Sequence, residues 1–157
     1  MKNNKYKVLV LLGGNSPERD VSLHSGKTII DALRRAGHEV IDYDTVNGFD
    51  LLEKYKNKVD VVFPILHGLN GEDGIVQAAL EREGFKYLGS DSDASKLAFD
   101  KVETHKLLEK HKIKMPAYAE VQLVDVHTDS VFKKAYVLKP IRGGSSIDTQ
   151  IVRIVNN

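Results

Sequence analysis

Short apolar runs and helically spaced apolar positions alternate along the first half of the chain. Residues 8–12 form a continuous aliphatic run that ends at two glycines, which is typical of a strand buried on both faces of a parallel sheet. Residues 22–36 carry apolar side chains three and four positions apart, which predicts a helix ending at Gly37. The same pattern predicts strands over 39–43 and 59–66 and a helix over 49–55. Alternation of this kind predicts an α/β domain with a parallel sheet.

The pattern changes after a predicted helix over residues 74–83 and a predicted short strand at 87–88. A small polar cluster follows, so we place the end of the first domain at residue 94 and the start of a second at residue 95. The second domain is predicted to contain a charged helix over 95–111, extended chain over 117–124 and 136–139, a glycine- and serine-rich turn over 140–146 and a strand over 150–155. A helix followed by hairpin strands indicates the beginning of a second domain.

The composition narrows the class of partner. The 157 residues include 23 Lys and Arg and 22 Asp and Glu, interleaved along the chain, and the net charge of +1 argues against a nucleic-acid or anionic-membrane partner. The absence of cysteine excludes disulfides, thiolate metal sites and a cysteine nucleophile, and it fits a reducing compartment. No apolar run reaches the length of a membrane span. We therefore expect a cytoplasmic protein that acts on a small molecule.

Two polar loops follow the first and third predicted strands. The first, over residues 13–26 (GGNSPERDVSLHSG), contains Glu18, and the second, over 67–74 (HGLNGEDG), begins with His67. Loops at the carboxyl ends of parallel strands commonly bind ligands, so these two segments could share one. A carboxylate that holds an ammonium group, beside donors for a carboxylate, would suit a zwitterion. The alternative is purely structural, with the glycines making a turn, a serine capping the helix and the charges in solvent.

Two lysines are candidates for phosphate binding. Lys139 follows three apolar or aromatic residues and precedes a GGSS turn, whose backbone N–H groups and hydroxyls could cradle phosphate oxygens. Lys101 lies in the amino-terminal part of the second domain's predicted helix, and by itself it is weak evidence for phosphate binding. The P-loop pattern GxxxxGK[ST] is absent. The alternative for Lys139 is a solvated side chain at a hairpin tip.

With these four segments in this order, the chain resembles the D-alanine–D-alanine ligases of the ATP-grasp class over nearly all of its length. GGNSPERDVSLHSG is similar to the family's opening signature GGxSxERxVSxxSG, and PILHGLNGEDG is similar to its second signature. Asp100-Lys101 and the KPxRxGSS pattern over 139–146 are similar to its nucleotide-binding segments. The resemblance implies a Rossmann-like parallel-sheet domain over residues 1–94, followed over 95–157 by the opening part of an α+β ATP-grasp domain.

The resemblance also implies roles for individual residues. Glu18 would recognise the ammonium group of the first D-alanine and would order the catalytic site together with Ser145. His67 and Ser22 would lie at the same substrate. The ATP phosphates would be held by Lys101, Lys139, Ser145 and Ser146. The implied reaction uses ATP and magnesium to phosphorylate one D-alanine, whose acyl phosphate the second D-alanine's amine attacks, for peptidoglycan precursor synthesis. The resemblance is also compatible with pairing of two copies through the first domain.

The chain departs from the family pattern at two positions of the fourth segment. Gly143 stands where the family usually has an acidic residue before GSS, and Asp148 stands where it usually has a glycine. The first change removes a charge that helps to fix the loop, and the second adds a Cβ atom and a negative charge near the phosphates. The family's adenine-binding segment and magnesium ligands correspond to positions after Asn157. We therefore expect no metal ligands among these residues and no activity from the chain alone.

Two other classes of function compete with this interpretation. The first domain could bind a small amino acid or a nucleotide without turnover, and a reading frame for the second ATP-grasp half directly after the gene would argue against that. A dinucleotide-binding oxidoreductase domain is suggested by the strand–helix–strand opening and by Asp42 or Asp44 near the end of the second strand. That class is disfavoured because GGNSPE lacks the order GxGxxG and because the charged loop would crowd a pyrophosphate.

Overall fold

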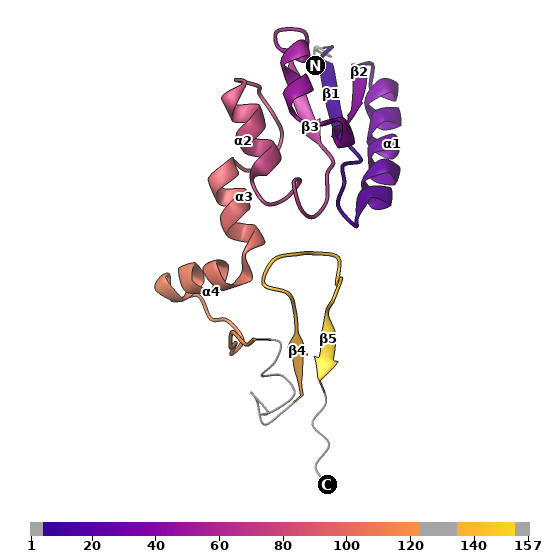
Figure 1. The fold of residues 1–157 in the computed structure, drawn as a ribbon. Helices are drawn as coiled ribbons and strands as arrows, with labels where there is room; N and C mark the ends of the chain where they lie inside the picture. The colour runs from indigo at the N-terminus through magenta and orange to yellow at the C-terminus, as the bar shows by residue number, and fades with distance from the viewer. Residues whose placement is uncertain (1–4, 123–134, 153–157) are drawn as a thin grey trace. The chain divides into compact units, whose positions relative to one another are not determined.

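The computed structural model describes residues 5–122 and 135–152, and the chain separates into two compact units, Met1–Phe99 and Asp100–Asn157 (Figure 1). The first unit contains β1 (Lys7–Leu12), α1 (Arg19–Arg35), β2 (Glu39–Asp44), the 3-10 helices η1 (Thr45–Asn47) and η2 (Asp50–Tyr55), β3 (Val61–Pro64), α2 (Ile75–Arg82) and α3 (Ser92–Phe99). The second contains α4 (Lys101–Lys110), β4 (Tyr136–Leu138) and β5 (Gln150–Val152). The expected domain division between residues 94 and 95 concerns the domains of the family and stays a prediction.

The sheet of the first unit is parallel and has the strand order β2–β1–β3. In the central strand β1, Val10 lies opposite Asp42 of β2 and Phe63 of β3. Tyr87, predicted to lie in a short strand, makes only an isolated parallel bridge to Val62. The predicted α/β fold with a parallel sheet is confirmed. Because the strands are parallel, their carboxyl ends meet at one edge, where the two polar loops begin.

The central strand is buried on both faces because its alternate side chains enter two different cores. Leu9 is fully buried in one core with Leu52 and Leu80, from η2 and α2. Val10 is fully buried in the other core, where it joins Ile30 of α1. Figure 1 shows α1 and α2 on opposite sides of the sheet. The continuous aliphatic run therefore has the buried environment that its pattern predicts.

The boundaries of several elements differ from those predicted. The helix α1 begins at Arg19 instead of Ser22. Ser22 does not cap the helix but lies buried in its first turn. Its hydroxyl is bonded to backbone groups of two loops. The predicted helix over 49–55 is a 3-10 helix, and the predicted strand over 59–66 pairs only along β3. Tertiary contacts set these ends, which local patterns define poorly.

The single charged helix predicted over residues 95–111 is wrong, because the chain breaks at Asp100. This residue is extended, with φ −91° and ψ 110°, and it separates α3 from α4. Its carboxylate accepts hydrogen bonds from the N–H groups of Val102 (3.0 Å) and Glu103 (3.1 Å). Asp100 therefore caps α4, and the Asp-x-x-Glu spacing was the available sequence signal for a helix start.

The second unit contains a helix and an antiparallel strand pair. β4 and β5 pair with Tyr136 opposite Val152 and Leu138 opposite Gln150, as the predicted hairpin requires. Residues 117–122 form no strand. The ends of two predicted segments, 123–124 and 153–155, lie outside the described residues. Among the helices of the described chain, none is long and apolar enough to cross a membrane.

Candidate functional site

The loop after β1 is held by an ion pair that contacts both backbone polar groups of Gly14. Arg19 donates from Nη1 to the Gly14 carbonyl oxygen (2.7 Å) and to Asp44 Oδ1 (2.9 Å), and from Nη2 to Asp44 Oδ2 (2.5 Å). Asp44 Oδ1 also accepts the N–H groups of Gly14 (3.1 Å) and Val46 (3.0 Å). The Arg19–Asp44 pair, called the loop clamp below, therefore ties the turn after β1 to the end of β2. A paired, bidentate guanidinium and carboxylate are among the stronger polar contacts in proteins.

The loop clamp changes the titration of its carboxylate. The hydrogen bond from the Arg19 guanidinium lowers the pKa of Asp44 from 3.8 to about 2, and the Val46 and Gly14 N–H groups add to the effect against the opposing influence of burial. All these donors favour the ionised carboxylate. Asp44 is therefore a structural anion and not a candidate proton carrier at neutral pH.

Replacing Asp44 with asparagine is expected to flatten part of the acid unfolding profile. A carboxyl whose pKa is lower when folded than when unfolded stabilises the fold above its unfolded pKa, and this contribution is lost as pH falls. For Asp44 the loss falls between about pH 4 and pH 2. The measurement is the urea unfolding free energy at successive pH values. Identical pH slopes for the wild type and Asp44→Asn in this window would contradict the assigned pairing.

Ser22 joins the ends of two strands from within α1. Its hydroxyl accepts the Gly13 N–H (2.9 Å) and donates to the Ile65 carbonyl oxygen. The Ser22 side chain is fully buried. The geometry places Ser22 under the candidate site as a support, and its direct contact with a substrate stays a prediction.

The two polar loops of the first unit meet, as their positions after β1 and β3 predict. The Ser16 hydroxyl donates to the His67 carbonyl oxygen (2.8 Å) and accepts the Glu18 N–H (3.2 Å). The Glu18 carboxylate lies directly over Gly68, because a Cβ atom built at Gly68 would collide with Glu18 Oε2. Glu18 is 6% exposed. A buried carboxylate and an imidazole-bearing loop therefore share one edge of the sheet.

The two carboxylates of the second loop mainly shape that loop. Glu72 Oε2 accepts the Gly68 N–H (3.0 Å), and Glu72 Oε1 lies 3.7 Å from His67 Nδ1. Asp73 accepts the N–H groups of Asn70 (2.9 Å) and Ile75 (3.2 Å). His67 Nε2 is buried and makes no hydrogen bond within the described part of the chain. This nitrogen is available to a ligand or a water molecule, since buried polar atoms are normally satisfied.

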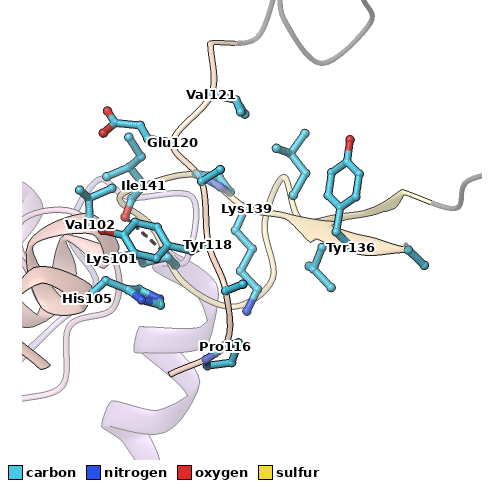
Figure 2. A pocket seen from close by; sticks show the side chains of 16 residues that line it. Lys101, Val102, His105, Pro116, Tyr118, Glu120, Val121, Tyr136, Lys139 and Ile141 are labelled. Carbon is cyan, nitrogen blue, oxygen red and sulfur yellow. Dashed lines mark hydrogen bonds between the residues drawn. The ribbon is translucent and has the colours of Figure 1, made fainter. Parts of the chain in front are cut away.

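The two candidate phosphate-binding lysines line one pocket of the second unit, of about 560 Å³ (Figure 2). Lys101 Nζ donates to the carbonyl oxygens of Gly143 (2.9 Å) and Ile141 (3.5 Å), so it also holds the turn after β4. Figure 2 shows the side chains of Lys139 and Tyr118 among those that line this pocket. Two ammonium groups at one apolar-walled pocket suit an anionic ligand that also carries a flat, apolar part.

The turn between β4 and β5 holds several side-chain-bearing residues in the left-handed region. Ser145, Ser146 and Asp148 have φ values of 49°, 59° and 54°, and Gly143 has 136°. Aspartate tolerates this region better than most residues, although glycine is the residue without the penalty. The departure at Asp148 thus falls at a position whose backbone favours glycine. Gly143 occupies a conformation that an acidic residue would adopt only with strain.

Several residues that organise the site escaped the sequence interpretation. The sequence interpretation treats Arg19 only as one of the loop charges that could lie in solvent and Asp44 only as part of a disfavoured oxidoreductase pattern, but each is the other's partner. In the second unit, Arg142 Nε donates to Asp100 Oδ2 (3.0 Å) beside an antiparallel bridge between the two residues. In the sequence, the position of Arg19 next to Glu18 was the available signal that Arg19 belongs to the candidate site. Among the described residues, no cluster of histidine or acidic side chains is suited to a metal ion.

Comparison with known proteins shows that the chain is similar to ligases. The family described as D-ala D-ala ligase N-terminus matches residues 44–90. The chain is 43% identical to the D-alanine–D-alanine ligase of Sphingopyxis alaskensis, over 100% of this chain and 51% of that protein. It thus spans about half the length of the curated relatives it matches.

Solved structures give the same result. The chain matches a D-alanine–D-alanine ligase from Bacillus anthracis with a TM-score of 0.78 and 31% identity, over 95% of this chain and 50% of that one. It also matches the same bacterium's ligase in complex with ATP, with a TM-score of 0.76, 30% identity and the same two coverages. In sequence and in fold the chain is thus similar to about half of a D-alanine–D-alanine ligase, and the family model that it matches describes the amino-terminal part.

Proposed function

We propose that this chain supplies the first-substrate site and part of the ATP-phosphate site of an ATP-dependent D-alanine–D-alanine ligase. In the proposed reaction, the γ-phosphoryl group of ATP passes to the carboxylate of one D-alanine and leaves ADP. The amine of a second D-alanine then attacks the acyl phosphate, so that inorganic phosphate leaves and the dipeptide forms. Such a reaction would serve peptidoglycan precursor synthesis in the cytoplasm.

The observation that carries the proposal is the position of Glu18 over Gly68, between two loops of a chain whose relatives bear this ligase's name. A buried carboxylate suits the ammonium group of an amino acid. His67 Nε2, unsatisfied within the described chain, is a candidate partner for the same substrate. The role of Ser145 alongside Glu18 stays a prediction.

The proposed nucleotide site rests on the pocket of the second unit. Lys101 and Lys139 both line it, and the turn with Ser145 and Ser146 follows directly after β4. These residues fit the phosphates of ATP, because phosphoryl transfer needs charge neutralisation and positioning more than covalent help. No metal cluster occurs among the described residues, so we assign magnesium to none of them.

The test is ATP-dependent phosphate release with magnesium and D-alanine, measured for the chain alone and mixed with the carboxyl-terminal half of a related ligase. We expect activity only in the mixture, with L-alanine as the inactive control. Lys139→Met in the chain should abolish the activity of the mixture, whereas Lys58→Met, outside both sites, should not. Phosphate release independent of D-alanine would contradict the proposal. Binding of D-alanine without turnover in any mixture would support a binding module instead.

Replacing Asp148 with glycine is expected to strengthen nucleotide binding to the chain. The change removes a negative charge from the turn that carries the two serines and relieves a left-handed φ of 54°. An increase of about fivefold in affinity for a non-hydrolysable ATP analogue is expected, which corresponds to about 1 kcal/mol. Asp148→Asn separates the two causes, because it removes the charge but keeps a side chain. Equal affinity in all three proteins would contradict the expectation.

A further inference from the structure

The loop clamp lies immediately beside the proposed substrate carboxylate in the sequence but points away from it. Arg19 follows Glu18 at the start of α1, and successive helical residues diverge by about 100° around the axis. Arg19 reaches Asp44 at the end of β2, whereas Glu18 lies over Gly68 after β3. Holding one of these neighbours therefore restricts where the other can point.

The loop clamp is also hydrogen-bonded to the backbone that precedes the first turn of α1. Both polar groups of Gly14 are bonded to it, and the Gly13 N–H is bonded to Ser22. The glycine turn lies in close contact with the Arg19–Asp44 pair, because a Cβ atom added at Gly13 would lie 2.8 Å from Arg19 Nη1 and closer still to Asp44. The chain on the amino-terminal side of Glu18 is thus bonded to the same ion pair as the chain on its carboxyl-terminal side.

A second ion pair between the same two elements provides a comparison. Arg34, near the other end of α1, lies 3.7 Å from Asp42 of β2, and both side chains are more than half exposed. This pair contacts through one nitrogen, at a distance longer than a hydrogen bond. Exposed pairs of this kind contribute little to stability. The Arg19–Asp44 pair differs in its two-pronged geometry and in its contacts with Gly14 and Val46.

We propose that the loop clamp is a positioning device for the first-substrate site: Arg19 and Asp44 hold the glycine turn and the first turn of α1 so that the Glu18 carboxylate faces the 67–74 loop. This inference rests on the proposed function for the identity of the ligand, D-alanine. Neither Arg19 nor Asp44 contacts the substrate in this assignment. Their effect on binding is transmitted through the backbone of Gly14 and the orientation of Glu18.

Arg19→Lys is the sharpest test, because it keeps the charge but removes the planar fork that reaches Asp44 and Gly14 together. The matched control is Arg34→Lys, in the same helix and toward the same strand. Two quantities are measured on the full chain of each variant: amide hydrogen exchange at Gly14 and Glu18, whose N–H groups are both hydrogen-bonded, and affinity for D-alanine by calorimetry. The global unfolding midpoint is recorded to show that each variant is folded.

Arg19→Lys is expected to speed exchange at both amides and to weaken D-alanine binding about tenfold or more, which corresponds to about 1.4 kcal/mol. Arg34→Lys should stay within about twofold of the wild type, as surface substitutions usually do. Folded Arg19→Lys protein with unchanged exchange at the Glu18 amide would overturn the positioning proposal, whatever the affinity. A wild-type chain that does not bind D-alanine would instead count against the proposed function, and the exchange data would still decide the role of the clamp.

Discussion

A Glu18→Gln variant is expected to fold normally and to lose most of its D-alanine affinity. The amide has nearly the shape of the carboxylate, so it can occupy the same buried position over Gly68. It cannot offer a negative charge to the ammonium group of the ligand. A hydrogen bond to a charged group contributes about 1.5–3 kcal/mol, so the expected loss is roughly tenfold to a hundredfold.

The control for this variant is Asp20→Asn, which removes a neighbouring negative charge from the first turn of the same helix. Asp20 is exposed, so this change should leave D-alanine affinity nearly unaltered. Calorimetric titration with D-alanine and with L-alanine measures both variants. Folded Glu18→Gln protein with wild-type affinity for D-alanine would reject the role assigned to Glu18.

Gly13→Ala is expected to be a strongly destabilising methyl addition in the candidate site. Gly13 has a φ of 74°, and an added Cβ atom would lie 2.6 Å from Asp44 Cγ and 2.8 Å from Arg19 Nη1. The left-handed backbone costs a side-chain-bearing residue about 1–2 kcal/mol. Overpacking against the clamp adds about 1–3 kcal/mol. The free energy of unfolding should fall by roughly the sum of the two.

Gly84→Ala isolates the backbone part of this cost. Gly84 has almost the same φ, 75°, but nothing lies within 4 Å of an added Cβ atom. Urea denaturation of the two variants gives the difference, which should equal the overpacking cost of about 1–3 kcal/mol at Gly13. Equal destabilisation by both substitutions would show that the turn can move away from the clamp, and it would weaken the case that the clamp fixes Glu18.

The meeting of the two polar loops was predictable because it depends on one property of the fold. Loops that follow parallel strands emerge at the same edge, so a pattern that predicts β1 and β3 also predicts that their loops are neighbours. The position of Glu18 over Gly68 agrees with that expectation. The roles of Glu18, His67 and Ser22 toward a substrate, and of the two lysines toward ATP, stay predictions until the binding experiments are done.

The break at Asp100 shows where periodicity misleads. Charged residues at helical spacing continue through residues 95–111, so the pattern predicts one helix. The carboxylate of Asp100 instead accepts two N–H groups of the following turn and a bond from Arg142, a residue distant in the sequence. The cap could be read locally from the spacing of Asp100 and Glu103, but the Arg142 contact could not.

The sequence by itself determined the parallel α/β character of the first unit, the hairpin of the second and the resemblance to D-alanine–D-alanine ligases. These follow from local patterns: a continuous aliphatic run, helical spacing and glycine-marked turns. Only the tertiary structure decided that Arg19 bonds to Asp44 and that Ser22 is a buried link between loops. A charged or hydroxyl side chain has the same local signature in solvent and in a buried bond, so its partner is fixed only when distant segments pack together.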